Sequence, residues 1–268
     1  MTEQLVSSSG YAADVEAQLR ADSAEIIARY PDARSALLPM LHLIQSVDSF
    51  VSPRGVALCA EILELSRAEV SAVATFYSQY KRKPNGSYTV GVCTNTLCAV
   101  MGGDDIFDAV STHLGLGNDE TTPGGEVTLE RIECNAACDY APVVMVNWEF
   151  FDNQTPASTV TLVDSLVAGT PVTASRGPVV QDFKHVSRVL AGFEDDLVDE
   201  GGAGGAATMV GLEIARKHHW HAPAYSGSET ADASNAEVGD AHVGEANSSA
   251  DRATSAGAPK DLEKGKDV

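Results

Sequence analysis

Four of the five cysteines form two short-range pairs, and their spacing constrains this chain more than any other feature. Four residues separate Cys93 from Cys98, three separate Cys134 from Cys138, and 35 residues lie between the pairs. Each pair directly follows a predicted strand, so the two pairs can lie on neighbouring loops at one edge of a sheet. Four thiolates that converge there form a soft site, suited to zinc or to an iron–sulfur cluster.

The spacing alone leaves three kinds of site open. Loops of three and four residues favour a [2Fe–2S] cluster with two thiolates on each iron, because such loops are wide and can point backbone N–H groups at the sulfurs. A zinc site is the second interpretation, although structural zinc most often uses Cys-x2-Cys pairs. A redox dithiol or an inert set is the third, and the sequence has no Cys-x2-Cys motif typical of thiol oxidoreductases.

The first eighty residues have the pattern of short amphipathic helices. Ser52 and Pro53 are typical of an N-cap and the first helical position. Ser66 and Glu69 have the spacing of a capping box that opens another helix. We predict a bundle-like helical module over residues 11–80, without residues typical of a catalytic site.

A second domain is predicted over residues 86–175, after a short basic linker. Hydrophobic periodicity predicts strands at 88–93, 127–133 and 142–148, and helices at 106–114 and 160–167. This β-α-β-β-α order indicates a small α/β sandwich, which places the whole chain in the α+β / α/β class.

The C-terminal part differs in composition. Residues 194–268 carry 15 acidic and 6 basic side chains and are rich in Gly, Ala and Ser. Such a segment buries too little apolar surface to offset its ordering entropy, so we predict a largely disordered acidic tail. Residues 209–220 are an exception, since their pattern predicts a short amphipathic helix that could dock on a neighbouring subunit.

Charge and hydropathy restrict the partners. The formal net charge is -20, which argues against a nucleic-acid partner. No apolar run approaches the roughly 18 residues of a membrane span, and the N-terminal residues lack the pattern of a secretory or organelle signal. We therefore expect a cytoplasmic protein. A G-x-G-x-x-A pattern at 202–207 follows an acidic run instead of a strand, so we predict no nucleotide site there.

The segments around the cysteines resemble the thioredoxin-like [2Fe–2S] ferredoxin family. They are 87–98, SYTVGVCTNTLC, and 128–142, TLERIECNAACDYAP. The resemblance extends upstream through 37–45 and 73–77 and so covers about residues 30–170. Within the family, the residues are most similar to the 24 kDa branch, which serves proton-pumping NADH–quinone oxidoreductases, respiratory complex I.

The resemblance implies a fold, a ligand set and partners. It implies a thioredoxin-like domain behind a helical extension, and one [2Fe–2S] cluster on Cys93, Cys98, Cys134 and Cys138. It also implies electron exchange with FMN on a neighbouring NADH-binding flavoprotein subunit, contact with a neighbouring iron–sulfur subunit, and a peripheral position on the cytoplasmic side of a membrane. The equivalent subunit of an NAD-dependent formate dehydrogenase or hydrogenase is the alternative within this chemistry, and a zinc-stabilised adaptor is the alternative from another class.

Five other residues carry separate expectations. The family usually has glycine where this chain has Ala136, so the second loop is expected either to shift or to have an ordinary conformation there. Asp139 is expected to be solvated. Cys59 and His42 are expected to be packing residues of the helices, whereas Phe76 could face either the core or a partner subunit.

Overall fold

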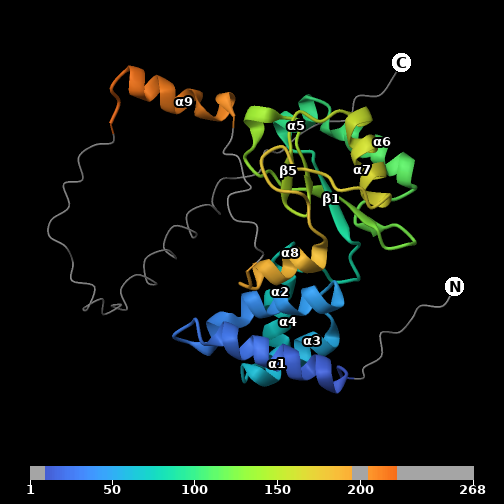
Figure 1. Ribbon diagram of the computed structural model, residues 1–268, viewed down its shortest axis with the longest axis vertical. Helices are drawn as coiled ribbons and strands as arrows, with labels where there is room; N and C mark the ends of the chain where they lie inside the picture. Colours follow the sequence, from blue (N-terminus) through green and yellow to red (C-terminus); the bar gives the residue numbers. More distant parts are fainter. Residues whose placement is uncertain (1–9, 195–204, 222–268) are drawn as a thin grey trace, which may run out of the picture. The chain divides into compact units, whose positions relative to one another are not determined.

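The computed structural model describes residues 10–194 and 205–221 and is shown in Figure 1. Its helices and strands, in chain order, are α1 (Ala13–Ile27), the 3-10 helix η1 (Ala33–Ala36), α2 (Leu37–Asp48), α3 (Pro53–Ile62), α4 (Arg67–Phe76), β1 (Tyr88–Cys93), α5 (Thr96–Val100), α6 (Gly103–Leu114), β2 (Glu120–Thr121), β3 (Val127–Ile132), the 3-10 helix η2 (Cys138–Tyr140), β4 (Val144–Val146), β5 (Glu149–Phe151), α7 (Pro156–Val167), α8 (Phe183–Leu190) and α9 (Ala206–Lys217).

The short helices predicted for the N-terminal part are present as α1 to α4. Ser52 caps α3 by accepting a hydrogen bond from the Gly55 N–H at 3.1 Å, and Ser66 forms the predicted capping box with Glu69 at the start of α4. The helices enclose an apolar core of their own, to which α2 contributes most of its length. Local sequence and burial therefore agree over this part of the chain.

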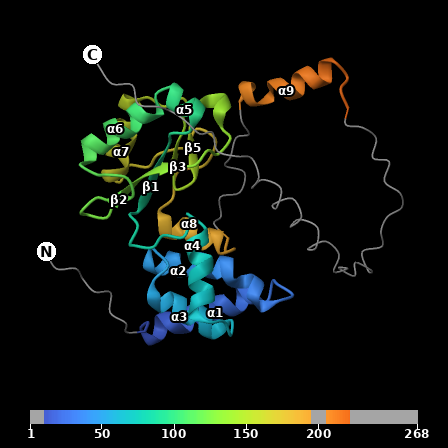
Figure 2. The same ribbon diagram turned by 180° about the vertical axis from the view of Figure 1, so that it is seen from behind.

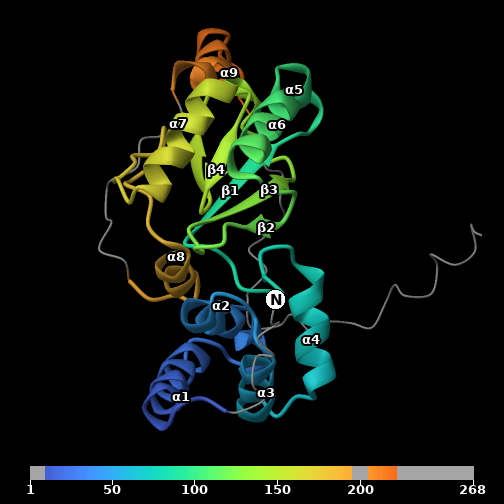
Figure 3. The ribbon, with the colours of Figure 1, turned by 90° about the vertical axis from the view of Figure 1, so that its right-hand side faces the viewer.

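A five-stranded mixed sheet forms the second core. The strand order is β2-β3-β1-β4-β5, with β1 parallel to β3 and the other neighbours antiparallel. Helices α6 and α7 lie side by side over one face of the sheet (Figure 3). Val90, Val92 and Leu129 point towards these helices and are fully buried, as the period of two along each strand requires.

The segment predicted as one strand at 142–148 is instead a tight hairpin. Its first strand is β4, and the turn that follows is formed by Asn147 and Trp148. Both turn residues have positive φ, 46° and 72°, and the chain then returns as β5. The Asn147 side chain stabilises the turn, because its amide donates to the carbonyl oxygens of Ser87 and Gln181 at 2.9 and 2.8 Å. An Asn-Gly pair would have indicated this turn in the sequence, whereas Asn-Trp does not.

A helix that the sequence analysis did not predict, α8, packs against α2 (Figures 1 and 2). Arg188 of α8 pairs with Asp22 of α1 at 2.7 Å, and the Lys184 ammonium donates to the Val47 carbonyl oxygen at 2.8 Å. The chain thus leaves the N-terminal helices after α4 and returns to them after the sheet.

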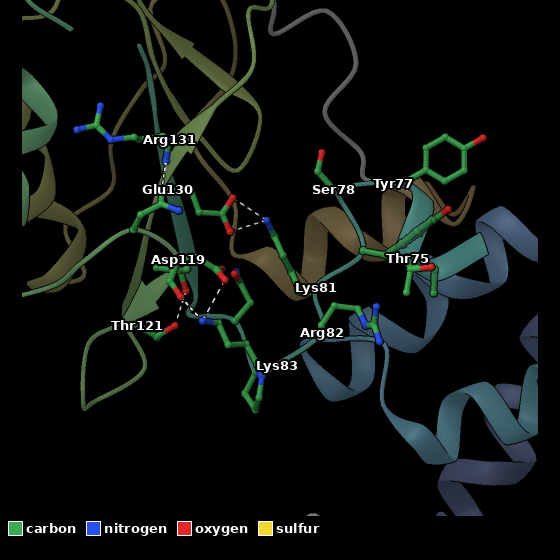
Figure 4. Close-up of a pocket in the computed structure, with 16 residues that line it drawn as sticks. Thr75, Tyr77, Ser78, Lys81, Arg82, Lys83, Asp119, Thr121, Glu130 and Arg131 are labelled. Atoms are coloured by element: carbon green, nitrogen blue, oxygen red, sulfur yellow. Dashed lines mark hydrogen bonds and ion pairs between the residues drawn. The ribbon is translucent and has the colours of Figure 1, made fainter. Parts of the chain in front are cut away.

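The basic linker after α4 is fixed by ion pairs, and it lines a pocket beside the sheet (Figure 4). The Lys81 ammonium lies 2.6 Å from the Glu130 carboxylate of β3, and both side chains are mostly buried. Lys83 pairs with Asp119 at 3.1 Å. The ion pairs of Lys81 and Lys83 therefore attach this linker to the sheet domain.

Helix α9 covers most of the helix predicted at 209–220 and starts three residues earlier. At its first turn, Thr208 donates to the Asp139 carboxylate and the Ala207 N–H lies 3.3 Å from the Tyr140 hydroxyl. The predicted disorder of the rest of the tail falls outside the described residues, so the domain limits 11–80, 86–175 and 194–268 stay predictions. No helix within residues 10–194 and 205–221 has the length and apolarity to cross a membrane.

Candidate metal centre

The first cysteine pair lies where β1 meets α5 and α6. Cys93 is the last residue of β1 and Cys98 lies within α5, and both are buried. Gly103, the first residue of α6, passes so close that a Cβ there would stand 2.4 Å from the Cys93 carbonyl oxygen and 2.9 Å from that of Cys98. The Asn95 side chain links this loop to the neighbouring strand β3, because its amide donates to the Ile132 carbonyl oxygen at 3.0 Å. Close backbone packing thus holds this pair at the edge of the sheet.

The second pair follows β3 and is exposed. Cys134 lies two residues beyond the strand and Cys138 opens η2. Between them, Ala136 has a φ of 56° and its N–H points at the Cys134 Sγ at 3.4 Å. The expectation that Ala136 has an ordinary conformation is wrong. Alanine itself takes the left-handed conformation, at a cost of about 1 kcal/mol.

The thiols of the second pair have a separation that suits one tetrahedral metal ion. The Sγ atoms of Cys134 and Cys138 are 4.0 Å apart, close to the separation of about 3.8 Å for two thiolates bound at about 2.3 Å to one tetrahedral ion. The Val143 N–H lowers the pKa of the Cys98 thiol, and the Asn95 amide lies 3.9 Å from the Cys93 Sγ. Such N–H groups stabilise negative sulfur, as iron–sulfur sites require.

The two pairs also influence each other's ionisation. Burial, together with the nearby Cys93 and Cys138 thiols, raises the pKa of the Cys98 thiol to about 11 against the opposing effect of the Val143 N–H. Hydrogen bonding with Cys134 raises the pKa of Cys138, and Cys93 adds to this. Cys98 and Cys138 therefore hold their protons more firmly than ordinary thiols, so that binding of a metal by these two would release protons.

The remaining candidate residues have structural surroundings. Cys59 is 1% exposed and burial raises the pKa of its thiol to about 12, so it is a core residue as expected. His42 packs against the Tyr80 ring, with centroids 4.9 Å apart, and burial lowers its pKa to about 4, which confirms a packing role. Phe76 is 80% exposed and Tyr77 is 45% exposed, so neither belongs to the core.

Comparison with known families decides the cofactor. Residues 23–167 match the family described as thioredoxin-like [2Fe-2S] ferredoxin. The chain belongs to the thioredoxin-like [2Fe–2S] ferredoxin family. Its cofactor is a [2Fe–2S] cluster, and it is an electron-transfer subunit of an oxidoreductase.

The matches to individual relatives cover from about half to four fifths of the chain. It is 60% identical over 220 residues to a subunit of the NADH-quinone oxidoreductase of Mycobacterium tuberculosis (strain ATCC 25618 / H37Rv), a match that covers 82% of this chain and 87% of that one. It is 34% identical over 127 residues to NADH-quinone oxidoreductase subunit 2 of Thermus thermophilus, covering 47% and 70%. A crystal structure of an NAD+-reducing [NiFe]-hydrogenase covers 50% of this chain and 23% of its own at 18% identity, and its TM-score of 0.46 supports no functional conclusion.

Two features beside the cysteines of this ferredoxin domain were missed in the sequence. Leu97, Val100 and Met101 form an exposed apolar patch on and just after α5 (the α5 patch). Arg176 lies against the segment that follows Cys138. Five residues are too few for helical periodicity to indicate α5, and nothing in the sequence around Arg176 links it to the second ligand loop.

The positive φ at Ala136 gives a first prediction. Replacing Ala136 by glycine should relieve the strained conformation and stabilise the loop by up to about 1 kcal/mol. The guanidinium concentration at which half of the visible cluster absorption is lost should then rise. Ala137→Gly is the matched control, since Ala137 has a φ of -96° and is buried, so its replacement should lower this midpoint. Equal shifts for both variants would contradict the assignment of strain to Ala136.

Proposed function

We propose that this chain holds one [2Fe–2S] cluster on Cys93, Cys98, Cys134 and Cys138, with both thiolates of each loop on one iron. When bound, the cluster supplies a one-electron redox centre. The approach of the two cysteine loops at one edge of the sheet carries this proposal, because the buried pair and the exposed pair are near enough to affect each other's pKa values. The chain's own task is to hold the four thiolates, direct N–H groups at them and shield the buried pair from water.

The proposed electron donor is FMN on a neighbouring NADH-binding flavoprotein subunit of an NADH–quinone oxidoreductase. The names of the relatives support this, since they are subunits of NADH–quinone oxidoreductases. The neighbouring iron–sulfur subunit of the complex is a second proposed partner. Through the complex, the chain would be peripheral on the cytoplasmic side of the membrane. FMN and NADH bind the partner in this proposal, not this chain.

Electron paramagnetic resonance of the full complex tests the proposal. The chain, co-purified with its flavoprotein subunit, should give a [2Fe–2S] signal when NADH is added, and the chain purified alone should contain two iron and two sulfide ions. A cluster that NADH leaves oxidised, although its measured reduction potential lies above that of the NADH couple, would refute the flavin as donor. If the chain co-purified with formate dehydrogenase or hydrogenase subunits instead, the proposed host complex would be wrong.

The α5 patch lies next to the proposed cluster and suits contact with the flavoprotein subunit. Val100 is 80% exposed, Met101 53% and Leu97 43%, whereas Cys98 between them is buried. Apolar surface beside a redox centre excludes water when a partner covers it and brings the two cofactors close. We propose this patch as part of the flavoprotein contact.

Charge introduced into the α5 patch should weaken that contact. A Val100→Asp, Met101→Glu variant should keep its visible spectrum but co-purify with the flavoprotein subunit at least tenfold less, because the new carboxylates must be desolvated in the interface. Val167→Asp is a suitable control, since Val167 is 45% exposed at the end of α7, outside the patch. Unchanged co-purification of the patch variant would place the contact elsewhere, for example on the N-terminal helices.

A further inference from the structure

Arg176 binds two carboxylates beside the second ligand loop. Its Nε and Nη2 lie 2.8 Å from the Asp152 carboxylate oxygens, and its Nη2 lies 3.5 Å from Oδ1 of Asp139, the residue after Cys138. The three side chains are 17%, 13% and 24% exposed, so solvent screens their charges only in part. The single positive charge of Arg176 therefore interacts with two partly buried carboxylates, and one of them follows the proposed ligand Cys138 directly.

Two aromatic rings pack against the Arg176 guanidinium. Its Cζ lies 5.0 Å from the centroid of the Tyr140 ring and 5.1 Å from that of Phe150. Tyr140 belongs to η2, whose first residue is Cys138. Cation–π contact and the two-point bond to Asp152 together hold the arginine in one orientation.

The arginine joins three segments that are distant in sequence. The first is η2, the second is the turn after β5, and the third is the segment 173–179, whose ends pair as an isolated bridge. Backbone bonds support the same junction: the Asn153 N–H donates to the Tyr140 carbonyl oxygen at 2.9 Å, and the Ser175 N–H to that of Phe150 at 2.8 Å. The exposed Cys134–Cys138 loop is thus braced on one side by Arg176 and its partners.

We propose that Arg176 is a positioning residue for the cluster: it braces the Cys138 end of the second ligand loop, and its charge offsets Asp139 and Asp152. This inference rests on the proposed ligand set. Reduction adds one negative charge to the cluster, so a nearby cation favours the reduced form and nearby carboxylates disfavour it. The balance of these three charges therefore acts on the reduction potential of the cluster, and the brace acts on its retention.

The test uses variants of the full-length holoprotein. They change the net charge of Arg176, Asp139 and Asp152 in opposite directions, and the reduction potential of the cluster is measured. Arg176→Gln removes the cation and should lower the reduction potential and speed the loss of visible absorption in chelator several-fold. Asp152→Asn removes one anion and should raise the potential. Arg176→Lys keeps the charge but loses the two-point bond to Asp152 and the contact with the aromatic rings. It should therefore keep nearly the wild-type potential while losing the cluster faster than the wild type.

Arg54→Gln is the matched control. Arg54, in the N-terminal helices, likewise binds a buried carboxylate, that of Asp48 at 2.5 Å, and lies 4.3 Å from the Tyr11 ring centroid. This variant should lose stability yet leave the potential unchanged. Unchanged potentials in both Arg176→Gln and Asp152→Asn, or shifts of the same sign, would overturn the inference. Failure of the ligand set itself would be recognised separately, by a wild-type protein that holds no [2Fe–2S] cluster.

Discussion

A variant in which Cys134 and Cys138 are both serine should lack the visible absorption of a [2Fe–2S] cluster. The two thiols stand 4.0 Å apart, as the ligands of a single iron do, so the double replacement removes both protein ligands of that iron. Each single replacement, including Cys93→Ser and Cys98→Ser, should weaken or abolish cluster assembly. Absorption and iron content of the purified variants measure this directly. A full [2Fe–2S] spectrum in the double variant would falsify the ligand assignment.

The fifth cysteine is the control for these variants. Cys59 is 1% exposed in the core of the N-terminal helices, so Cys59→Ser should leave the cluster spectrum intact. It should still lower the free energy of unfolding by about 1–3 kcal/mol, because a hydroxyl is buried where a thiol was. Denaturation followed by circular dichroism separates this loss of stability from a loss of cluster.

Replacing Gly103 by alanine should disrupt the first ligand loop as severely as the loss of a ligand. The added Cβ would stand 2.4 Å from the Cys93 carbonyl oxygen and 2.9 Å from that of Cys98. Both neighbours are backbone atoms, so neither can rotate away, and the two ligand segments must separate. Overpacking of this kind costs about 3 kcal/mol. We expect the purified variant to contain less than a tenth of the wild-type iron.

Gly124→Ala shows whether this effect depends on position. A Cβ at Gly124 would also meet an atom closely, but that atom belongs to the Glu126 carboxylate, which can swing into solvent. This variant should therefore keep its iron and its spectrum. If Gly103→Ala held as much iron as Gly124→Ala, the first loop would be more adaptable than its packing indicates.

The sequence predicted those parts of the molecule that local chemistry specifies. The capping residues Ser52 and Ser66 and the strands before each cysteine pair are where the sequence analysis expected them. Each of these signals acts within a few residues: a cap bonds the next turn, and alternation of side chains marks a strand. The two cysteine pairs could be assigned to neighbouring loops on the same basis.

Features that depend on distant contacts could not be predicted in this way. Helix α8 has only eight residues, and its contacts are with α2, far away in the sequence. The positive φ of Trp148 and of Ala136 is imposed by surrounding structure against local preference. Arg176 acts through Asp139 and Asp152, whose proximity exists only in the folded chain.

The return of α8 to α2 has a consequence for protein synthesis. About 130 residues separate Asp48, where α2 ends, from Phe183, where α8 begins. At about 5–20 residues per second, a ribosome needs on the order of ten seconds to cover that distance. During this interval the surface of α2 that α8 will cover stays open, and both cysteine loops are synthesised before α8. The nascent chain thus presents its two cysteine loops to the cell before α8 can cover α2.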